Sequence, residues 1–252
     1  MNRIIKLHFS PNGGTKAAVD DLAAGFTAKE IVEIDMTVPA NRKTDWTFKE
    51  SDLVLAGMPV YSGRLPAISA EIFKMLQGNK AKTIAIASYG NRHYDDALLE
   101  LTNELDAKGF RVVAAGAVIA EHCLEISVAA KRPDAVDRAK LLEIAGLVNA
   151  KLEANNDQQP EVYGNIPYKE LKATPTPIGN DDCDQCGLCA KNCPTEAIDF
   201  SDGRKTDPEK CIYCARCINI CPKGARSTEK LVGTKQWLIE NCSERREMEW
   251  FL

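Results

Sequence analysis

The sequence from Cys183 to Pro222 reads CDQCGLCAKNCPTEAIDFSDGRKTDPEKCIYCARCINICP and contains eight of the ten cysteines of the chain. It holds two copies of the pattern Cys-x-x-Cys-x-x-Cys-x-x-x-Cys-Pro, and the second copy begins at Cys211, 28 residues after the first. The stretch is therefore an internal repeat. Three thiolates at positions i, i+3 and i+6 share one short loop and can hold three corners of a cubane, while the fourth cysteine of such a run ligates the other cluster. This spacing predicts two iron–sulfur clusters.

The two predicted [4Fe–4S] clusters each draw ligands from both copies. The ligands expected for the first are Cys183, Cys186, Cys189 and Cys221. Those expected for the second are Cys193, Cys211, Cys214 and Cys217. Zinc sites use two separated Cys-x-x-Cys pairs and do not account for the third cysteine of each copy, and nothing marks a secreted chain with disulfides. Over about residues 181–226, the stretch resembles the bacterial two-[4Fe–4S] ferredoxins.

The composition is that of an ordinary globular protein, with 44% hydrophobic and 27% charged residues in 252. This length allows one to two domains, so a large fold is expected beside the cysteine repeat. The net charge of −4 argues neither for nucleic acid nor for an anionic membrane surface as a partner, so none is expected. No window approaches the ~20 apolar residues of a membrane span, and the first residues do not resemble a signal peptide. We expect a cytoplasmic protein whose thiolates stay reduced, from an anaerobic or low-oxygen host.

Short apolar runs alternate with amphipathic stretches over residues 1–154. Strands are expected at 3–9, 30–35, 51–57, 82–88 and 110–119, and helices at 15–26, 66–77, 94–108 and 134–154. This alternation predicts a parallel sheet with helices on both faces. The runs starting at Leu53 and Ile84 are apolar at successive positions, as in central strands that are covered on two sides. The segment 1–154 is thus predicted to be one doubly wound α/β domain with five strands.

Three loops at the predicted carboxyl edge of this sheet carry glycines and polar residues, and ligands of doubly wound sheets bind at that edge. The loop 10–15 contains two glycines and leads into a helix, whose N-terminus supplies N–H donors for a phosphate. It matches neither a Walker loop nor Gly-x-Gly-x-x-Gly, and a plain tight turn is the alternative. The loops 57–66 and 89–96 combine tyrosines, glycines and polar groups suited to a flat ring, with ordinary surface loops as the alternative. Together the three loops predict a flavin.

The first 154 residues resemble the flavodoxin-like fold, which implies the strand order 2-1-3-4-5. The segments 59–66 and 89–98 are similar to those of the flavodoxin–ferredoxin fusion proteins of the EFR1 family, and the resemblance extends to about residue 226. It implies FMN as the cofactor, with the isoalloxazine ring between the loops of Tyr61 and Tyr89. FAD is less favoured because no second nucleotide-binding half is visible.

The phosphate of FMN is implied to bind at the loop 10–15, although Pro-Asn-Gly at 11–13 departs from the repeated threonines of commoner flavodoxins. The residues implied to contact FMN are Ser10, Asn12, Gly13, Gly14, Thr15, Pro59, Val60, Tyr61, Ser62, Gly63, Arg64, Tyr89, Gly90, Asn91, Arg92, Tyr94 and Asp95.

The remaining segments connect and follow the two predicted domains. Residues 155–180 are rich in Asn, Gln, Pro and Gly and are predicted to be a linker that packs over the surface, because electrons must cross between flavin and cluster. The ferredoxin-like domain, a small α+β unit, is expected at 181–227. The extension 228–252 is predicted to form a helix followed by a charged end. Its Trp237, Leu238 and Trp250 are expected to dock within the chain, or on a second subunit of a homodimer.

A flavin exchanges one or two electrons, and a [4Fe–4S] cluster exchanges one. A chain that holds both can therefore convert between one-electron and two-electron chemistry. We expect an electron-transfer protein that passes electrons between FMN, the clusters and a protein redox partner. The alternatives are a reductase of a small acceptor such as a quinone, nitro compound or enone, and a redox or oxygen sensor. A reductase needs a proton donor, for which His93, Tyr94 and His122 are the candidates, although a lone histidine is more often structural. Cys123 and Cys242 are expected to be structural.

Overall fold

The computed structural model describes residues 2–171, 175–228 and 231–252. Part of the predicted linker, 172–174, and part of the predicted C-terminal extension, 229–230, lie outside the described residues, as does residue 1. None of the described helices is long and apolar enough to cross a membrane.

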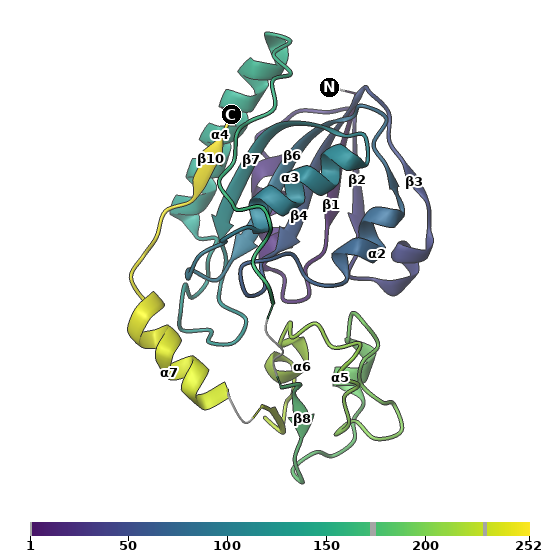
Figure 1. The fold of residues 1–252 in the computed structure, drawn as a ribbon, viewed down its shortest axis with the longest axis vertical. Coiled ribbons are helices and arrows are strands. Elements are labelled where there is room, and N and C mark those ends of the chain that lie inside the picture. Colours follow the sequence, from purple (N-terminus) through teal and green to yellow (C-terminus); the bar gives the residue numbers. More distant parts are fainter. Residues whose placement is uncertain (1, 172–174, 229–230) are drawn as a thin grey trace.

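A six-stranded sheet with the order β10-β7-β6-β4-β1-β2 forms the centre of the fold (Figure 1). Its strands are β1 (Arg3–His8), β2 (Glu30–Asp35), β4 (Asp52–Pro59), β6 (Lys82–Tyr89), β7 (Arg111–Ile119) and β10 (Glu249–Phe251). The first five are parallel to one another. Counted along the chain without β10, they run in the order 2-1-3-4-5, which is the flavodoxin-like order of a doubly wound sheet. The α/β fold class predicted from the sequence is confirmed.

The sixth strand corrects the prediction of five strands. β10 pairs antiparallel with β7, and Trp250 lies opposite Gly116. A Cβ atom at residue 116 would come within 2.6 Å of the Trp250 ring, so glycine is what allows the indole to approach the strand. The pairing covers an edge that would otherwise be open to other chains. The sequence predicts only a charged end here because three residues are too few for a strand pattern to be recognised.

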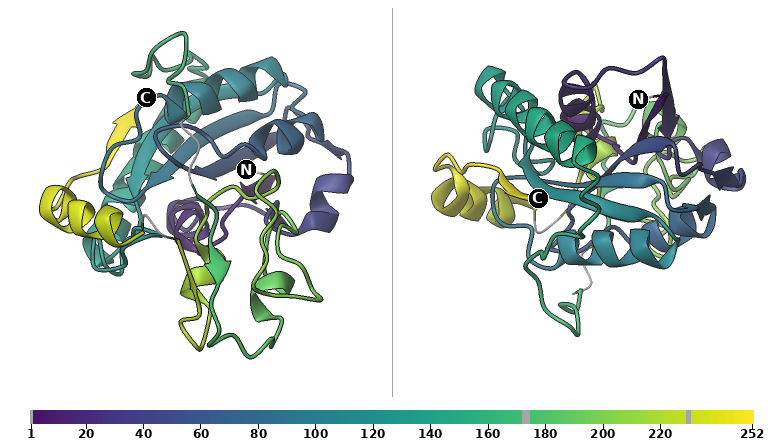
Figure 2. Two further views of the ribbon diagram at one scale, coloured as in Figure 1. Left: turned by 60° about the horizontal axis from the view of Figure 1, so that its bottom comes forward. Right: turned by 90° about the horizontal axis from the view of Figure 1, so that it is seen from above.

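Helices cover both faces of the sheet (Figures 1 and 2). α1 (Gly14–Ala23) and α4 (Ala135–Glu153) pack on one face, and α2 (Ser69–Lys74) and α3 (Ala97–Ala107) pack on the other. All eight residues of β4 are buried, as expected for a central strand covered on both sides. α4 begins after Asp134, whose side chain accepts hydrogen bonds from the first-turn N–H groups in a capping box.

The predicted helix 66–77 is shorter in the structure, where α2 ends at Lys74. Leu76–Gln77 forms β5, which pairs in parallel with β3 (Trp46–Thr47), a strand preceded by the 3-10 helix η1 (Pro39–Lys43). The carbonyl oxygen of Met75 accepts a hydrogen bond from the Trp46 N–H at 2.7 Å. The helix stops because the backbone at this point is paired with β3 instead of with the next helical turn.

The cysteine repeat forms a small unit of its own. β8 (Ile178–Gly179) and β9 (Arg226–Ser227) pair antiparallel, and the one-turn helices α5 (Leu188–Lys191) and α6 (Arg216–Asn219) lie within the two cysteine runs. This unit lies below the sheet in Figure 1, beside the loops at one end of the strands. Figure 2 shows it projecting from the sheet domain at that end.

Hydrogen bonds hold the cysteine repeat against the carboxyl edge of the sheet. Asn12, in the loop after β1, donates to the carbonyl oxygen of Cys214 at 2.6 Å. Asn219 donates to the carbonyl oxygen of Cys123, in the loop after β7, at 2.9 Å. The repeat therefore lies over the edge at which the sequence predicts a ligand.

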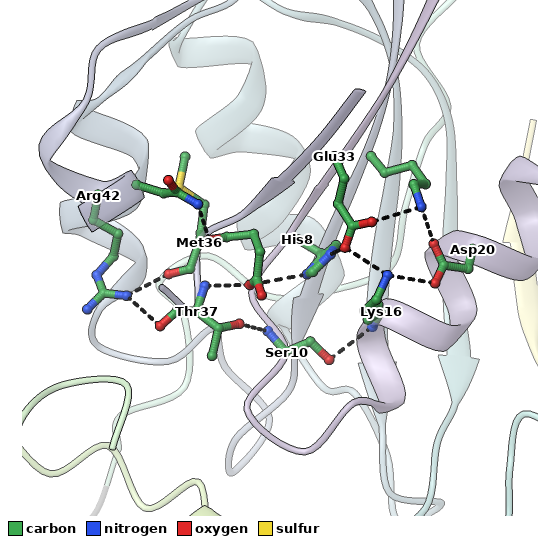
Figure 3. A network of polar contacts seen from close by, with 11 residues as sticks. His8, Ser10, Lys16, Asp20, Glu33, Met36, Thr37 and Arg42 are labelled. Atoms are coloured by element: carbon green, nitrogen blue, oxygen red, sulfur yellow. Dashed lines mark hydrogen bonds and ion pairs between the residues drawn. The ribbon is translucent and has the colours of Figure 1, made fainter. Parts of the chain in front are cut away.

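Arg42, in η1, makes a further link between the two parts. Its buried guanidinium donates to the carbonyl oxygen of Met36 at 2.6 Å and to the carbonyl oxygen of Pro194 in the first cysteine run. Figure 3 shows the first of these bonds within the polar network beside β2. Because a buried guanidinium must keep its acceptors, this side chain fixes the distance between the repeat and the sheet domain.

Residues 155–171, the first part of the predicted linker, run over the sheet domain. The backbone N–H groups of Asn165 and Lys169 donate to the Asp96 carboxylate at 2.8 and 2.6 Å. Asp157 forms ion pairs with Lys82 and Arg111 at 2.8 and 2.6 Å. These contacts bind the segment to α3 and to the starts of β6 and β7.

The C-terminal residues return to the sheet domain. In α7 (Leu231–Cys242), Leu238 and Cys242 are buried against Val128. The chain then reaches β10 at the sheet edge, on the same side of Figure 1. The helix is thereby held beside the loop that follows β7.

Candidate functional site

The repeat cysteines line two separate cavities. The four that line one cavity, called the inner cysteine group here, are Cys193, Cys211, Cys214 and Cys217. The four that line the other, called the outer cysteine group, are Cys183, Cys186, Cys189 and Cys221. Each group combines three cysteines of one copy with the fourth cysteine of the other copy. Four thiols around one cavity are the donor set of a [4Fe–4S] cluster, so the residues present fit this cofactor.

Left-handed backbone positions turn the chain around each cavity. α5 follows Gly187 at φ 71°, and α6 follows Ala215 at φ 57°. An alanine in this conformation is strained, and such strain is found where the surrounding structure requires the turn. The N–H of Ala197 points at the Cys193 sulfur at 3.3 Å, a contact of the kind that tunes iron–sulfur clusters.

Each group has one buried cysteine, Cys214 in the inner group and Cys189 in the outer group, and the groups differ at Cys186 of the outer group, which is exposed. Burial raises the pKa of the Cys214 thiol. A metal that binds this thiol as a thiolate would therefore have to displace its proton.

A cavity of about 230 Å³ lies beside the inner group, at the carboxyl edge of the sheet. Its walls come from the loops after β4, β6 and β7, from Tyr213 of the repeat and from Trp237 of α7. A smaller cavity of about 60 Å³ adjoins it and extends toward the loop after β1. The residues that line both are Val60, Tyr61, Tyr89, Gly90, His122 and Cys123. We call the two together the ring cavity.

The Tyr61 hydroxyl is buried in the wall of the ring cavity and has no hydrogen-bond partner among the residues that the structure describes. Burial raises the pKa of this hydroxyl, and the nearby thiols of Cys214 and Cys123 raise it further, so it remains a donor. A buried donor without an acceptor is disfavoured and calls for a partner. The polar edge of an isoalloxazine ring carries such acceptors, so the cavity fits a flavin.

The loop between β1 and α1 presents backbone donors. Gly13 has φ 88°, and the N–H groups of Gly14 and Thr15 have no carbonyl one turn earlier to bond. A Cβ atom at residue 14 would come within 2.7 Å of the Ala120 Cβ, so glycine lets the loop lie close to the end of β7. An anion at a helix N-terminus of this kind is stabilised by the N–H groups and the helix dipole.

A polar network holds this loop against β2 (Figure 3). The Ser10 N–H donates to the Thr37 hydroxyl at 2.7 Å, and the Ser10 hydroxyl accepts from the Lys16 N–H at 2.9 Å. The Lys16 ammonium pairs with Glu33 at 2.7 Å, and its hydrogen bond lowers the pKa of Glu33 to about 2. The Ser10 side chain is therefore already engaged at the start of α1.

Two residues that the resemblance implies as flavin contacts hold other segments instead. Arg64 pairs with Glu100 of α3 at 2.7 Å. Asn91 is buried, and its amide donates to the carbonyl oxygens of Cys242 and Glu244 at 2.7 Å each. Neither side chain lines the ring cavity. Asn91 instead fixes the chain after α7.

Tyr94 and Asp95 also lie outside the lining of the ring cavity. The Tyr94 hydroxyl donates to the Glu249 carboxylate at 2.6 Å, and the pKa of Tyr94 is raised by burial and by this carboxylate. Asp95 pairs with Lys169 at 2.7 Å. Both side chains therefore connect the loop after β6 to later parts of the chain, β10 and the segment 155–171.

The histidine candidates do line the ring cavity. His93 is half-exposed, stacks on the Tyr94 ring at 4.9 Å and accepts at Nδ1 from the Asp95 N–H. Burial lowers the pKa of His122 to about 4, so its ring is neutral at pH 7. Burial also raises the pKa of Cys123 to about 11, so its thiol is protonated. A neutral imidazole and a neutral thiol give this wall an uncharged surface.

Several lining residues, among them Ser88, Tyr213 and Trp237, are missing from the residues expected at the flavin. The Ser88 hydroxyl is 2.6 Å from the Thr15 hydroxyl and lines the small cavity. Tyr213 and Trp237 line the large cavity. Tyr213 lies between two cysteines of the repeat, and Trp237 is expected only to dock, so neither carries a local signal for a flavin. Their positions follow from the docking of the repeat and of α7 on the sheet domain.

Residues 182–225 match the family model described as a 4Fe-4S dicluster domain. The polyferredoxin protein MvhB of Methanothermobacter thermautotrophicus is 39% identical over 61 residues, which cover 22% of this chain and 13% of the polyferredoxin. An uncharacterized ferredoxin of Methanocaldococcus jannaschii is 34% identical over 47 residues, 18% of this chain and 76% of that protein. The chain thus spans about an eighth of the polyferredoxin that it matches.

Solved structures resemble the sheet domain at low sequence identity. A flavodoxin from the domain Archaea is 14% identical with a TM-score of 0.39, and the match covers 60% of this chain and 99% of the flavodoxin. The rubredoxin oxygen:oxidoreductase of Desulfovibrio gigas is 17% identical with a TM-score of 0.42, over 61% of this chain and 37% of that one.

Proposed function

The C-terminal part of this chain, residues 182–225, belongs to the 4Fe-4S dicluster domain family, and from this we propose that the protein is an FMN-dependent iron–sulfur electron-transfer protein. It exchanges electrons between FMN at the ring cavity, two [4Fe–4S] clusters and an external protein partner. The observation that carries the proposal is the position of the inner cysteine group directly beside the ring cavity. Asn12 of the phosphate loop bonds to the backbone of Cys214 at 2.6 Å, so the two cofactor sites share a wall.

Each cysteine group is proposed to hold one cluster. The inner cluster has the thiolates of Cys193, Cys211, Cys214 and Cys217, and the outer cluster has those of Cys183, Cys186, Cys189 and Cys221. The thiolates must stay reduced, which is consistent with a cytoplasmic location.

FMN supplies the exchange of two electrons with one-electron carriers. Tyr61 and Tyr89 flank the ring cavity, and the buried Tyr61 hydroxyl is proposed to donate to the polar edge of the ring. Gly14 and Thr15, which line the smaller part of the ring cavity, are proposed to bind the phosphate through their backbone N–H groups. The Gly13 N–H instead donates to the Ser10 carbonyl oxygen at 3.2 Å. The neutral His122 and Cys123 exclude water from the ring without adding charge.

The arrangement supports one order of transfer. We propose that the inner cluster lies between the flavin and the outer cluster, because Tyr213 lines the ring cavity and the Cys214 carbonyl oxygen bonds to Asn12 of the sheet domain. The outer group carries the exposed Cys186 and is proposed to face the redox partner. We propose the sequence FMN, inner cluster, outer cluster, partner, in either direction.

An anaerobic stepwise reductive titration tests this function. Iron, sulfide and flavin are assayed on the same purified sample, and optical and electron paramagnetic resonance spectra are recorded at each step. The expected result is about eight irons and one FMN per chain, with cluster signals developing as the flavin band bleaches. Full iron without flavin would leave a ferredoxin attached to a sheet domain of another function.

A further inference from the structure

Arg226 lies in β9, in the core of the cysteine repeat, and is 3% exposed. Its Nη2 atom donates to the carbonyl oxygen of Pro177 at 2.8 Å and to the Thr206 hydroxyl, and its Nη1 atom donates to the carbonyl oxygen of Gly203. Its Nε atom is buried and has no partner among the described residues. The guanidinium, which is always charged in arginine, is therefore held in one position by neutral acceptors.

This guanidinium lies beside the outer cysteine group and close to the inner one. Its Nη1 atom is 3.9 Å from the sulfur of Cys189 in the outer group, and Arg226 lines the cavity of that group. Cys189 belongs to a buried cluster against which Cys193 and Cys217 of the inner group pack. One cation thus contacts a proposed ligand of the outer cluster and lies near two proposed ligands of the inner cluster.

The charge of Arg226 has no counter-ion among the residues that the structure describes. No ion pair within 4.0 Å joins Arg226 to a carboxylate in the part of the chain that the structure describes. The other buried arginines do pair: Arg132 with Asp137, and Arg42 with Glu71 at 3.6 Å. A buried cation is strongly disfavoured unless an anion accompanies it. The core of the repeat therefore requires anionic groups next to Arg226, and these are the thiolate-ligated clusters.

We propose that Arg226 is the shared counter-ion of the two clusters and raises the reduction potentials of both. The inference rests on the proposed function, because it requires both clusters to be bound. Reduction transfers one electron from the donor to a cluster and makes that cluster more negative by one charge. A fixed cation stabilises the reduced form more than the oxidised form. Net charge and hydrogen bonds to sulfur are among the properties that set such potentials, and burial of Arg226 limits screening by water.

The test compares three variants of the full-length holoprotein. Arg226→Gln removes the charge and keeps a hydrogen-bonding side chain. Arg226→Lys keeps the charge as an ammonium without the planar fork. Lys223→Gln is the matched control, because Lys223 lies two residues after Cys221 but is 55% exposed at its side chain. Iron and sulfide are assayed first, and both midpoint potentials are then measured by redox titration followed by electron paramagnetic resonance.

We expect Arg226→Gln to lower the potentials of both clusters. At a fixed potential the ratio of reduced to oxidised cluster should fall about tenfold, which is about 59 mV for a one-electron couple. Arg226→Lys should shift both potentials by less, and Lys223→Gln should change the ratio by less than about twofold because water screens an exposed charge.

Unchanged potentials in a fully loaded Arg226→Gln protein would overturn the inference, and so would an equal shift in Lys223→Gln. If Arg226→Gln does not load its clusters, Arg226→Lys decides: full loading supports a role for the charge, and failure to load assigns Arg226 to the folding of the repeat alone. Failure of the proposed function has a different signature. It would be seen in the unaltered protein as missing flavin or missing transfer between flavin and clusters.

Discussion

The inner and outer cysteine groups have the same cysteine spacing and different surroundings. The inner group lies against the ring cavity, with Cys214 buried and its carbonyl bonded to Asn12 of the sheet domain. The outer group includes Cys186, which is exposed to solvent. Two copies of one motif therefore give an asymmetric pair of sites. Tyr213 and Cys214 of the second copy border the ring cavity or bond to its loops, whereas the first copy meets the sheet domain through Pro194, which bonds to Arg42.

Position, not ligand type, therefore separates the roles that we propose for the two sites. A cluster in the inner group would exchange electrons with the flavin, and a cluster in the outer group would exchange them with a partner. Solvent exposure and hydrogen bonds to sulfur also set reduction potentials, so the same asymmetry is expected to separate the two potentials.

The largest effect is expected from removing one group at a time. Cys214→Ser should lose the inner cluster, so that iron falls from about eight to about four per chain and reduced flavin no longer reduces the outer cluster. Cys186→Ser should lose the same amount of iron but keep transfer from flavin to the inner cluster. Iron assays and cluster spectra after photoreduction of the flavin measure both outcomes.

Cys242→Ser is the matched control, because Cys242 is buried beside Leu238 and belongs to neither group. It should retain all of the iron. Equal loss of flavin-to-cluster transfer in Cys214→Ser and Cys186→Ser would remove the distinction between inner and outer.

A smaller effect is expected from Tyr61→Phe, which removes the buried hydroxyl without a partner. If the hydroxyl donates to the flavin, FMN should bind about fivefold more weakly, corresponding to about 1 kcal/mol for one hydrogen bond. The flavin-free protein should instead gain stability, since an unsatisfied buried donor is lost. Fluorescence titration with FMN measures the loss of affinity, and thermal unfolding of the flavin-free protein measures the gain in stability. An unchanged FMN affinity would place the ring elsewhere.

The wall between the inner group and the ring cavity can be weakened through Asn219. Its amide donates to the Cys123 carbonyl at 2.9 Å and to the Asn12 side chain at 3.2 Å. Asn219→Ala should retain flavin and iron but slow flavin-to-cluster transfer by roughly threefold, since each lost bond contributes about 0.5–1.5 kcal/mol to holding the parts together. Asn241→Ala, which alters an exposed side chain of α7, is the control. Equal rates of flavin-to-cluster transfer in both variants would show that the Asn219 hydrogen bonds do not position the inner group against the ring cavity.

The smallest effect concerns the pH dependence of the neutral cavity wall. Burial lowers the pKa of His122 to about 4 from an ordinary value near 6.5. Between these values the unfolded chain binds a proton that the folded chain does not, so this group makes folding stability rise with pH from about 4 to about 6.5. The ring protons of the three histidines, assigned with single His→Gln variants, should show His122 titrating well below the ordinary value near 6.5. A midpoint near 6.5 for His122 would contradict a buried, neutral ring.

The sequence predicted features that depend on local spacing and periodicity. The cysteine runs specify sets of ligands because three of each four lie within seven consecutive residues. The apolar runs of β4 and β6 indicate a parallel sheet because central strands are covered on both faces. Both properties are visible in short windows of the chain.

Features that depend on distant partners could not be predicted in this way. Arg64 and Tyr94 bond to Glu100 and Glu249 instead of lining the ring cavity. These partners lie 36 and 155 residues away in the sequence, so no local pattern shows the contacts. β10 is three residues long, and only its pairing with β7 makes it a strand. The role of Arg226 depends on two cysteine runs that surround it, which no linear pattern shows.

The most direct test of the central claim is the order in which the two clusters are reduced. Flavin in the intact holoprotein is photoreduced by a light pulse, samples are frozen at increasing times, and the cluster signals are identified with those of Cys214→Ser and Cys186→Ser. We predict that the inner cluster signal, the one retained in Cys186→Ser, develops first and that the outer cluster signal follows. An outer signal that develops first, or independently of the inner cluster, would contradict it.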